Sequence, residues 1–248
     1  MDADIYALLE VFGNSSLNDL CTALNTACQT NQYKYIENST ANQGMACFIY
    51  NSNTVIPFKE LQKNRLADNG YLPDRKIAQA FDLKANNERF IVCLNHWKAK
   101  DNSYNKPDEY ADTGDGQGSH VLRRVHEAEA TLEFIKTVTA YFEDEDVLVV
   151  GDLNSYSKED PIRVLEEGKL INELQKYAPN EYSYAFFSNN SYATGYLDHS
   201  FATATLDAVM LILFISMPMS LAYLKLLEVN RRKIICTAAP TIIPSLPS

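Results

Sequence analysis

The stretch Val149-Val150-Gly151-Asp152-Leu153-Asn154-Ser155-Tyr156 gives the strongest indication of the fold. It opens inside a continuous apolar run, residues 147–150, which is typical of a strand covered on both faces. A glycine, an acid and an amide follow where that strand should end. Because Asp-Leu-Asn is also an ordinary turn composition, the stretch gains a functional meaning only together with other parts of the chain.

Three further apolar runs also end in an acid, an amide or a histidine. They are residues 5–9 before Glu10, residues 90–94 before Asn95 and His96, and residues 195–197 before Asp198 and His199. The ends of neighbouring strands can converge on one crevice, where carboxylate and amide oxygens suit a hard cation such as Mg²⁺. A histidine there can transfer protons near neutral pH. Each feature alone fits a solvated carboxylate or a structural polar pair equally well, but their ordered combination favours a metal-dependent active site.

Apolar periodicity predicts strands and helices that interleave without a strict repeat. The expected strands are residues 4–11, 47–50, 77–83, 90–97, 147–150, 182–187 and 196–202. Helices are expected around residues 17–24, over residues 121–142, and from Asp160-Pro161, where an acid cap precedes a proline. Residues 101–118 are polar and glycine-rich, as in a long surface loop. The pattern indicates an α/β layered domain with mixed sheets.

Composition and charge exclude several classes of protein. The 248 residues are 46% hydrophobic and 22% charged, which excludes a disordered chain, a collagen-like chain and a small disulfide scaffold. The net charge of −10 argues against a basic protein that coats nucleic acid. A phosphate substrate must therefore be attracted by local positive charge or by a metal ion.

The N-terminal residues and the cysteines carry little functional signal. Residues 1–11 contain no basic segment and no cleavage pattern, so we expect no signal peptide. None of the five cysteines forms a Cys-x-x-Cys pair, and Cys47 and Cys93 lie in apolar runs. We expect buried free thiols rather than metal ligands or disulfides.

Residues 149–156 resemble the Gly-Asp-Leu-Asn motif of the endonuclease/exonuclease/phosphatase superfamily, which has the DNase-I-like fold. Residues 95–100, with the sequence Asn-His-Trp-Lys-Ala-Lys, resemble the Asn-His-x-Lys-Ser-Lys motif of its secreted bacterial nuclease branch. Residues 115–118 with Arg124, residues 158–162, residues 182–184 and residues 195–199 are similar to that branch as well. The resemblance runs in order from about residue 3 to about residue 207.

The resemblance implies an α/β four-layer sandwich of two mixed β-sheets flanked by helices, which is incomplete in this chain. It implies metal-assisted hydrolysis of phosphodiesters or phosphomonoesters. Glu10, Asp152 and Asn154 match the residues that hold the divalent ion, which would be Mg²⁺ or else Mn²⁺ or Ca²⁺. His96 matches a phosphate contact, Asp152 the carboxylate that activates water, Asn154 an amide that positions the phosphate, and Asp198 a further catalytic acid.

By the same resemblance, Arg75, Asn95, Lys98 and Arg124 are expected to bind substrate, with Gln79 and Lys100 beside them. Nucleic acid is the expected partner, DNA rather than RNA, and a monomer acting in the extracellular space or periplasm is expected. His199 is expected to be structural or to face substrate. His120 and His126 are expected to be surface residues at the start of the helix over residues 121–142.

The chain departs from the family pattern in three places. The family's first strand with its early Asn is missing, as if the chain were truncated at its N-terminus. Ser119-His120-Val121 stands where the branch often has Cys-Trp-Asn. No Ser-Asp-His motif, which carries the family's general-base histidine, follows residue 199. We therefore expect weak activity or none, and a catalytically inactive fragment or binding domain is the alternative to a nuclease.

Residues 208–248 differ in character from residues 1–207, and the expected division is a partial endonuclease/exonuclease/phosphatase-like domain followed by an aberrant hydrophobic tail. Residues 208–224 carry no charge, but Pro218 interrupts them. Taken at face value, they indicate a membrane-anchored phosphoesterase-like protein. We favour a frameshift, because the Ile-Asn-Ala-Asp-Glu run of related nucleases, translated one base late, gives residues 216–220. The gene sequence, translated in all frames, tests this interpretation.

Overall fold

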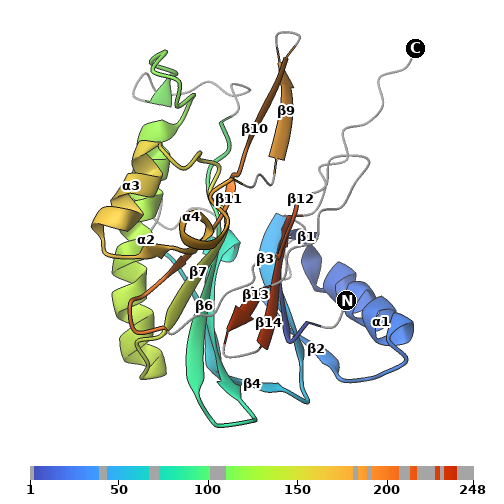
Figure 1. Ribbon diagram of the computed structural model, residues 1–248. Coiled ribbons are helices and arrows are strands. Elements are labelled where there is room, and N and C mark those ends of the chain that lie inside the picture. The colour runs from blue at the N-terminus through green and yellow to red at the C-terminus, as the bar shows by residue number, and fades with distance from the viewer. Residues whose placement is uncertain are drawn as a thin grey trace, which may run out of the picture.

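The computed structural model describes residues 3–38, 44–66, 73–100, 110–180, 184–188, 191–206, 213–216, 227–229 and 232–238. The side chains described are those of residues 3–180 within these ranges and of residues 195–206. The described elements form two β-sheets that pack face to face, with helices on both outer sides (Figure 1). This arrangement confirms the expected α/β sandwich of two mixed sheets.

The first sheet contains the N-terminal strand at its centre. Its strands are β1 (Ile5–Phe12), β2 (Tyr33–Ile36), β3 (Gly44–Asn51), β12 (Leu213–Ser216), β13 (Leu227–Val229) and β14 (Arg232–Ala238). Their order is β12-β14-β1-β3-β2, and β13 pairs with β14. Because β1 is antiparallel to β3 and parallel to β14, the sheet is mixed.

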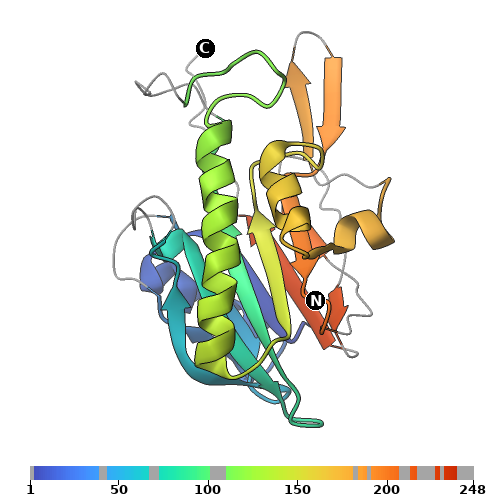
Figure 2. The same ribbon diagram turned by 90° about the vertical axis from the view of Figure 1, so that its left-hand side faces the viewer.

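The second sheet carries the motifs that the sequence singles out. Its strands are β4 (Val55–Lys63), β5 (Lys76–Leu83), β6 (Arg89–His96), β7 (Val147–Asp152), β8 (Ile171–Asn172) and β11 (Asp198–Ala202), in the order β4-β5-β6-β7-β11-β8. Strands β6 and β7 run parallel, whereas β7 and β11 run antiparallel. The hairpin of β9 (Tyr184–Ser188) and β10 (Ser191–Gly195) projects beyond this sheet (Figure 2).

Helices form the two outer layers. They are α1 (Gly13–Ala27) on the first sheet, α2 (Val121–Phe142) and α3 (Asp160–Glu167) on the second, the short α4 (Glu173–Tyr177), and the 3₁₀ turn η2 (Pro73–Arg75). Figure 2 shows α2 lying along the second sheet. Its apolar residues Ala128, Ile135, Val138 and Phe142 recur at helical spacing and pack on that sheet.

Three apolar clusters hold the four layers together. The cluster between the sheets includes Leu9, Phe48 and Phe81, and two further clusters lie under α1 and under α2 and α3. Successive side chains of a strand point to opposite faces, so Leu94 packs between the sheets whereas Cys93 packs under α2. This double burial explains why β6 and β7 are continuous apolar runs.

Some elements differ from the sequence-based expectation. Strand β4 was not predicted; it contains Pro57 and is an edge strand, where the missing N–H of a proline is tolerated. Strands β2, β8 and β10 and the short helix α4 were also not predicted. Helix α3 begins one residue earlier than expected, so Glu159 occupies the N-cap and makes no side-chain capping hydrogen bond. Residues 182–183 of the expected strand lie outside the described residues.

The described parts of residues 208–248 belong to the first sheet. Strand β14 pairs with β1 from Ile5 to Leu9, and β12 continues the sheet beyond β14. Within the part of the chain that the structure describes, no helix has the length and apolarity needed to cross a membrane. The division at residue 207 and the frameshift stay predictions, because backbone pairing does not test the origin of the segment.

Candidate active site

Three neighbouring strands of the second sheet bring an acid, a histidine and a second acid together. In the parallel pair β6–β7, His96 lies opposite Asp152, and in the antiparallel pair β7–β11, Asp152 lies opposite Asp198. All three residues stand at the strand ends that meet at one edge of the sheet. The predicted convergence of His96, Asp152 and Asp198 is therefore present in the fold.

Glu10 reaches the same place from the other sheet. The register of β1 against β3 shifts between Leu8 and Val11, which marks a β-bulge, and Glu10 has a left-handed backbone with φ 58°. A bulge turns a side chain out of its regular alternation, and such a conformation is uncommon for residues other than glycine. The Nε2 atom of His96 lies 3.7 Å from Oε1 of Glu10 and 3.9 Å from Oδ2 of Asp152. The two carboxylates therefore flank one imidazole across the sandwich.

The glycine of the Gly-Asp-Leu-Asn motif is required by the approach of two strands. Gly151 has φ 134°, and a Cβ placed on it would lie 1.9 Å from the carbonyl oxygen of Asn95. No side chain fits there without separating β6 from β7. The glycine therefore allows His96 and Asp152 to be neighbours.

Asp152 and Asn154 are tied to the turn that follows β6. The backbone N–H of Asn154 donates to Oδ1 of Asp152 at 2.9 Å, and its Nδ2 donates to the carbonyl oxygen of Trp97 at 3.0 Å. The N–H of Trp97 donates to the carbonyl oxygen of Asp152 at 3.0 Å. Asn154 adopts φ 48°, a left-handed conformation that asparagine tolerates better than most residues. The two motifs thus fix each other.

Helix α2 holds both backbone polar groups of Lys98. The N–H of Lys98 donates to Oε2 of Glu127 at 2.8 Å, and Nη1 of Arg124 donates to the carbonyl oxygen of Lys98 at 3.3 Å. Arg124 and Glu127 are one helical turn apart and buried. The other carboxylate oxygen of Glu127 pairs with Nζ of buried Lys76 at 2.8 Å.

Arg124 does not fit the expected role of a substrate contact, because its side chain is fully buried. Its guanidinium also donates to Oγ of Ser155 at 3.1 Å and to the carbonyl oxygens of Ser119 at 2.8 Å and Gln117 at 3.0 Å. The residue holds three loops together instead of presenting its charge to solvent.

Asn95 and Gln79 are also buried and turn away from the site. Oδ1 of Asn95 accepts a hydrogen bond of 3.4 Å from Thr131 on α2, because adjacent residues of β6 point to opposite faces. Gln79 donates to the carbonyl oxygen of Phe58 at 3.0 Å. Neither is placed to contact substrate as expected. Arg75 and Lys98 remain half-buried, and the positive charge of each lowers the pKa of His96, which puts both cations near the site.

The other histidines have structural positions. Nε2 of buried His199 lies 2.7 Å from the carbonyl oxygen of Ser155, which agrees with a structural role. His126 is exposed as expected, but His120 is buried, and its ring lies beside that of Tyr110. The expectation of a surface position for His120 was therefore wrong.

Burial and repulsion perturb the ionisation of the site. Burial, and after it the charges of Arg75, Lys76 and Lys98, lowers the pKa of His96 to about 3, so its imidazole is neutral at pH 7. Burial raises the pKa of Asp152 well above its ordinary value, and the negative charges of Asp198 and Glu10 raise it further.

Glu10 is perturbed in the same direction. Burial raises the pKa of its carboxyl group, and the charge of Arg75 opposes this rise. The site therefore concentrates carboxylates whose charge is poorly compensated. A bound cation would relieve that repulsion.

The donor set fits a hard divalent ion. Glu10 and Asp152 supply carboxylate oxygens and Asn154 an amide side chain, and Mg²⁺ is commonly held by one or two carboxylates together with water and substrate phosphate. Among the described residues, no group of three or more His, Cys, Asp and Glu side chains is arranged to hold a metal. A site here would therefore be completed by water or substrate.

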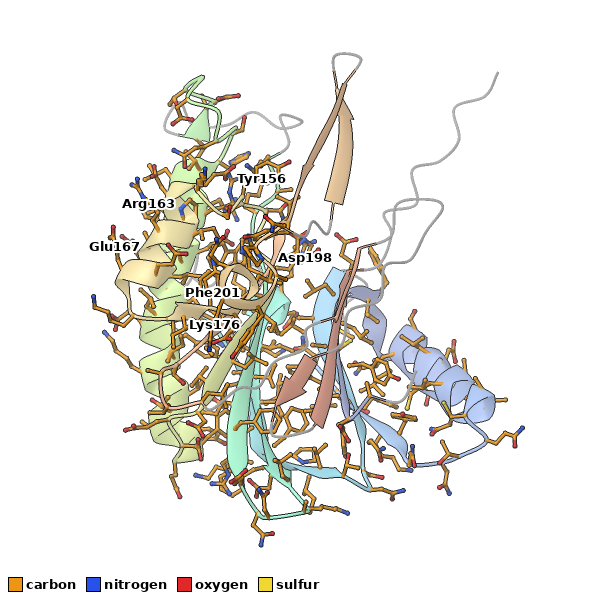
Figure 3. The ribbon with its side chains drawn as sticks, in the orientation of Figure 1. Tyr156, Arg163, Glu167, Lys176, Asp198 and Phe201 are labelled. Atoms are coloured by element: carbon orange, nitrogen blue, oxygen red, sulfur yellow. The ribbon has the colours of Figure 1, made fainter. Side chains whose placement is uncertain are left out.

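Figure 3 distinguishes the site from the outer surface of the second sheet. Asp198 and Tyr156 lie on one side, whereas Arg163 and Glu167 project outward from α3. Tyr156 leans on Gly195, where a Cβ would lie 2.7 Å from its ring. Lys100, expected near substrate, instead pairs with Glu159, and its Nζ lies 4.4 Å from the ring centre of Tyr156.

Lys76 and Glu127 were missed by sequence reasoning. Lys76 stands in β5, whose residues are mostly apolar, and Glu127 stands on the buried face of α2. A charge on each of two buried faces is the signal that could have indicated a buried ion pair.

No family model and no curated protein sequence matches the chain. Solved structures do. An endonuclease/exonuclease/phosphatase family protein from Bacteroides thetaiotaomicron matches with a TM-score of 0.56 and 18% identity, over 82% of this chain and 70% of that one. A mannosyl-6-phosphatase of Bacteroides thetaiotaomicron VPI-5482 matches with a TM-score of 0.59 and 16% identity, over 93% and 82% of the two chains.

The protein TDP2 from D. rerio, complexed with a single-strand DNA product, is also similar. Its TM-score is 0.54 and its identity 12%, over 81% of this chain and 70% of that one. Similarity at these identities extends to the fold and not to the chemistry of the site. The chain has the fold of the endonuclease/exonuclease/phosphatase family.

Proposed function

We propose that this protein is a divalent-metal-dependent phosphodiester hydrolase that cleaves DNA. The observation that carries the proposal is the position of His96, with Glu10 and Asp152 from different sheets at 3.7 Å and 3.9 Å from its Nε2. The printed names of the structural neighbours, a phosphatase and a protein bound to a DNA product among them, support phosphoester chemistry in general.

Glu10 and Asp152 would hold the ion through carboxylate oxygens, with Asn154 beside them. When bound, Mg²⁺ or Mn²⁺ polarises a phosphoryl oxygen and offsets the charge that develops on the leaving oxygen. The two carboxylates come from opposite sheets, so the ion site requires the intact sandwich.

Asp152 is the proposed base for the attacking water. Its Oδ2 lies 3.9 Å from Nε2 of His96, the proposed phosphate contact, so its carboxylate is placed to accept a proton from a water that attacks the phosphate. His96 is neutral, so it serves as a hydrogen-bond donor to a phosphoryl oxygen and not as a counter-charge. Asp198, directly opposite Asp152 in the β7–β11 pair, adds a further negative charge beside it.

Arg75 and Lys98 supply the local attraction for an anionic substrate. Their charges act on His96, although the whole chain carries a net charge of −10. A polyanion such as DNA would be attracted to this place and repelled elsewhere. Action as a monomer outside the cytoplasm belongs to the same proposal and rests on the sequence resemblance.

The test is metal-dependent cleavage of supercoiled plasmid by the purified full chain. We expect nicking with Mg²⁺ or Mn²⁺, none with EDTA, and none with Asp152→Ala. The matched control is Glu167→Ala, which removes a carboxylate on the outer face of α3 and should keep full activity. Cleavage that survives Asp152→Ala would contradict the assignment.

The same experiment separates the competing functions. Plasmid binding without cleavage in any metal would favour the inactive relative. Hydrolysis of a phosphomonoester such as p-nitrophenyl phosphate without plasmid cleavage would favour a phosphatase.

A further inference from the structure

Phe12 is the most exposed large apolar side chain in the described part of the chain, at 57% exposure. It is the last residue of β1, two residues after Glu10. Single exposed apolar residues are common and need no explanation by themselves. Phe12 differs because it stands beside a proposed metal ligand.

The position of Phe12 also breaks a local rule. It is the N-cap of α1, where Ser, Thr, Asp or Asn is preferred, and it makes no side-chain capping hydrogen bond. Its carbonyl oxygen accepts a 2.9 Å hydrogen bond from Oγ of Ser16. Because α2 and α3 also begin without a side-chain cap, the feature that distinguishes Phe12 is its exposed aromatic ring next to Glu10.

Three groups meet above Gly44, the cross-strand partner of Phe12. An ideal Cβ on Gly44 would lie 3.4 Å from Cα of Glu10, 3.7 Å from Cζ of Phe12 and 3.8 Å from Nη2 of Arg75. Arg75 is fixed there, because its Nε donates to the carbonyl oxygen of Gly44 at 3.1 Å. An aromatic ring and a guanidinium therefore meet beside the backbone of Glu10, and the charge of Arg75 is close enough to the Glu10 carboxyl group to lower its pKa.

These three groups match the parts of a nucleotide. A guanidinium pairs with a phosphate, and a carboxylate can share a metal ion with it. An exposed aromatic ring offers a flat apolar surface for a nucleobase, whatever its sequence. A sugar phosphate has the anion but no aromatic face, so it would leave Phe12 unused.

We propose that Phe12 is a stacking platform for a nucleobase next to the phosphate that the site binds. This inference rests on the proposed phosphodiesterase function and narrows its substrate class to nucleic acid. Discrimination between nucleic acid and sugar phosphate then resides in β1, in the same bulged segment that presents Glu10.

The binding test uses Phe12→Trp. The chain has one tryptophan, Trp97, which is 1% exposed, so unmodified protein reports little of what happens at the surface. The fluorescence of the new indole should be quenched by a thymidine oligonucleotide in Ca²⁺ or EDTA, and not by an abasic oligonucleotide with the same number of phosphates. Equal responses to both oligonucleotides, or no response to either, would overturn the proposal even in a chain that cleaves nothing.

The kinetic test uses Phe12→Ala on the same two oligonucleotides. Loss of base stacking should reduce kcat/KM for the thymidine oligonucleotide at least about fivefold more than for the abasic one. Phe12→Trp should restore the preference. Leu20→Ala, which removes an exposed apolar side chain from α1, is the matched control and should change neither value.

The two tests separate the failure of this inference from that of the proposed function. Base-dependent quenching without cleavage supports the stacking platform and contradicts the phosphodiesterase. Cleavage without base-dependent quenching, and with an equal loss of kcat/KM on both oligonucleotides in Phe12→Ala, supports the phosphodiesterase and contradicts the stacking platform.

Discussion

Gly151 lies so close to Asn95 that a Cβ on Gly151 would stand 1.9 Å from the carbonyl oxygen of Asn95. The same two strands place His96 opposite Asp152. The chain therefore brings the two site residues together at a position where only a glycine fits.

We predict that Gly151→Ala destabilises the fold by more than about 3 kcal/mol, because β6 and β7 must separate to admit the methyl group. The measurement is the urea midpoint of unfolding. Gly114→Ala is the control: Gly114 also has a positive φ, 75°, but no atom lies within 4 Å of its would-be Cβ. Gly114→Ala therefore reports backbone strain alone, which costs about 1 kcal/mol. An equal decrease in the free energy of unfolding in both variants would contradict the steric argument.

Because Lys76 and Glu127 form a buried ion pair, we expect substitutions of the two residues to have strongly non-additive effects on the free energy of unfolding. Lys76→Met should destabilise the fold by about 3–5 kcal/mol, because Glu127 is left charged and buried without its partner. Lys76→Met combined with Glu127→Gln should recover most of that loss, since glutamine still accepts from the N–H of Lys98. Urea unfolding of both variants measures the coupling, and a double variant as unstable as the single one would refute it.

Arg124 should not tolerate lysine. The guanidinium serves four acceptors on three loops, and an ammonium group cannot reproduce that fork. We expect Arg124→Lys to reduce the free energy of unfolding by about 2–4 kcal/mol. Arg163→Lys, at an exposed ion pair with Asp160 on α3, should change it by less than about 0.5 kcal/mol.

We expect buried His199 to make the free energy of unfolding decrease as the pH falls. Burial lowers its pKa from the ordinary 6.5 to about 4, so the unfolded chain binds the proton first. Its contribution is therefore fully present above pH 6.5 and is lost as the pH falls towards 4, on the order of 2–3 kcal/mol.

The check compares His199→Phe with the natural chain by urea unfolding at pH 7, 6 and 5. Phenylalanine keeps the ring beside Tyr196 and Phe201 but cannot be protonated. The slope of stability against pH should be smaller in the variant, and an unchanged slope would assign the acid sensitivity to other groups.

Thiol reactivity should follow burial and not cysteine number. Cys21, Cys47 and Cys93 are buried and free, as expected, whereas Cys28 is exposed. Burial also raises the pKa of Cys93 to about 12, so little thiolate exists there at neutral pH. Iodoacetamide should label Cys28 in the native protein, and Cys21, Cys47 and Cys93 only after denaturation, as peptide mass spectrometry would show.

His96 and Asp152 could be predicted because each ends an apolar strand, and the parallel strands β6 and β7 end side by side. Asn95 could have been separated from His96 by the alternation of a strand, since adjacent side chains face opposite sides. The buried position of Arg124 could not have been predicted. An arginine near a phosphate motif has the same sequence signature whether its charge faces solvent or three buried carbonyl groups.

Glu10 was identified, but not the bulge that aims it. A regular strand would carry its side chain elsewhere, and no glycine or proline in β1 announces the irregularity. Likewise, the pairing of Lys76 with Glu127 joins residues far apart in the chain, and their contact depends on the packing of α2 against β5. Such contacts follow from the assembled layers and not from any local pattern.

Glu10 and His96 belong to different sheets, so the 3.7 Å between Oε1 of Glu10 and Nε2 of His96 depends on how closely the two sheets pack. If the packing between the sheets loosened while each sheet kept its own hydrogen bonds, the distance between Glu10 and His96 would increase. A compact state with native strands but fluid packing would then have lost its chemistry already. Activity would fade before circular dichroism detected any loss of secondary structure, which makes the site an early reporter of the sandwich's integrity.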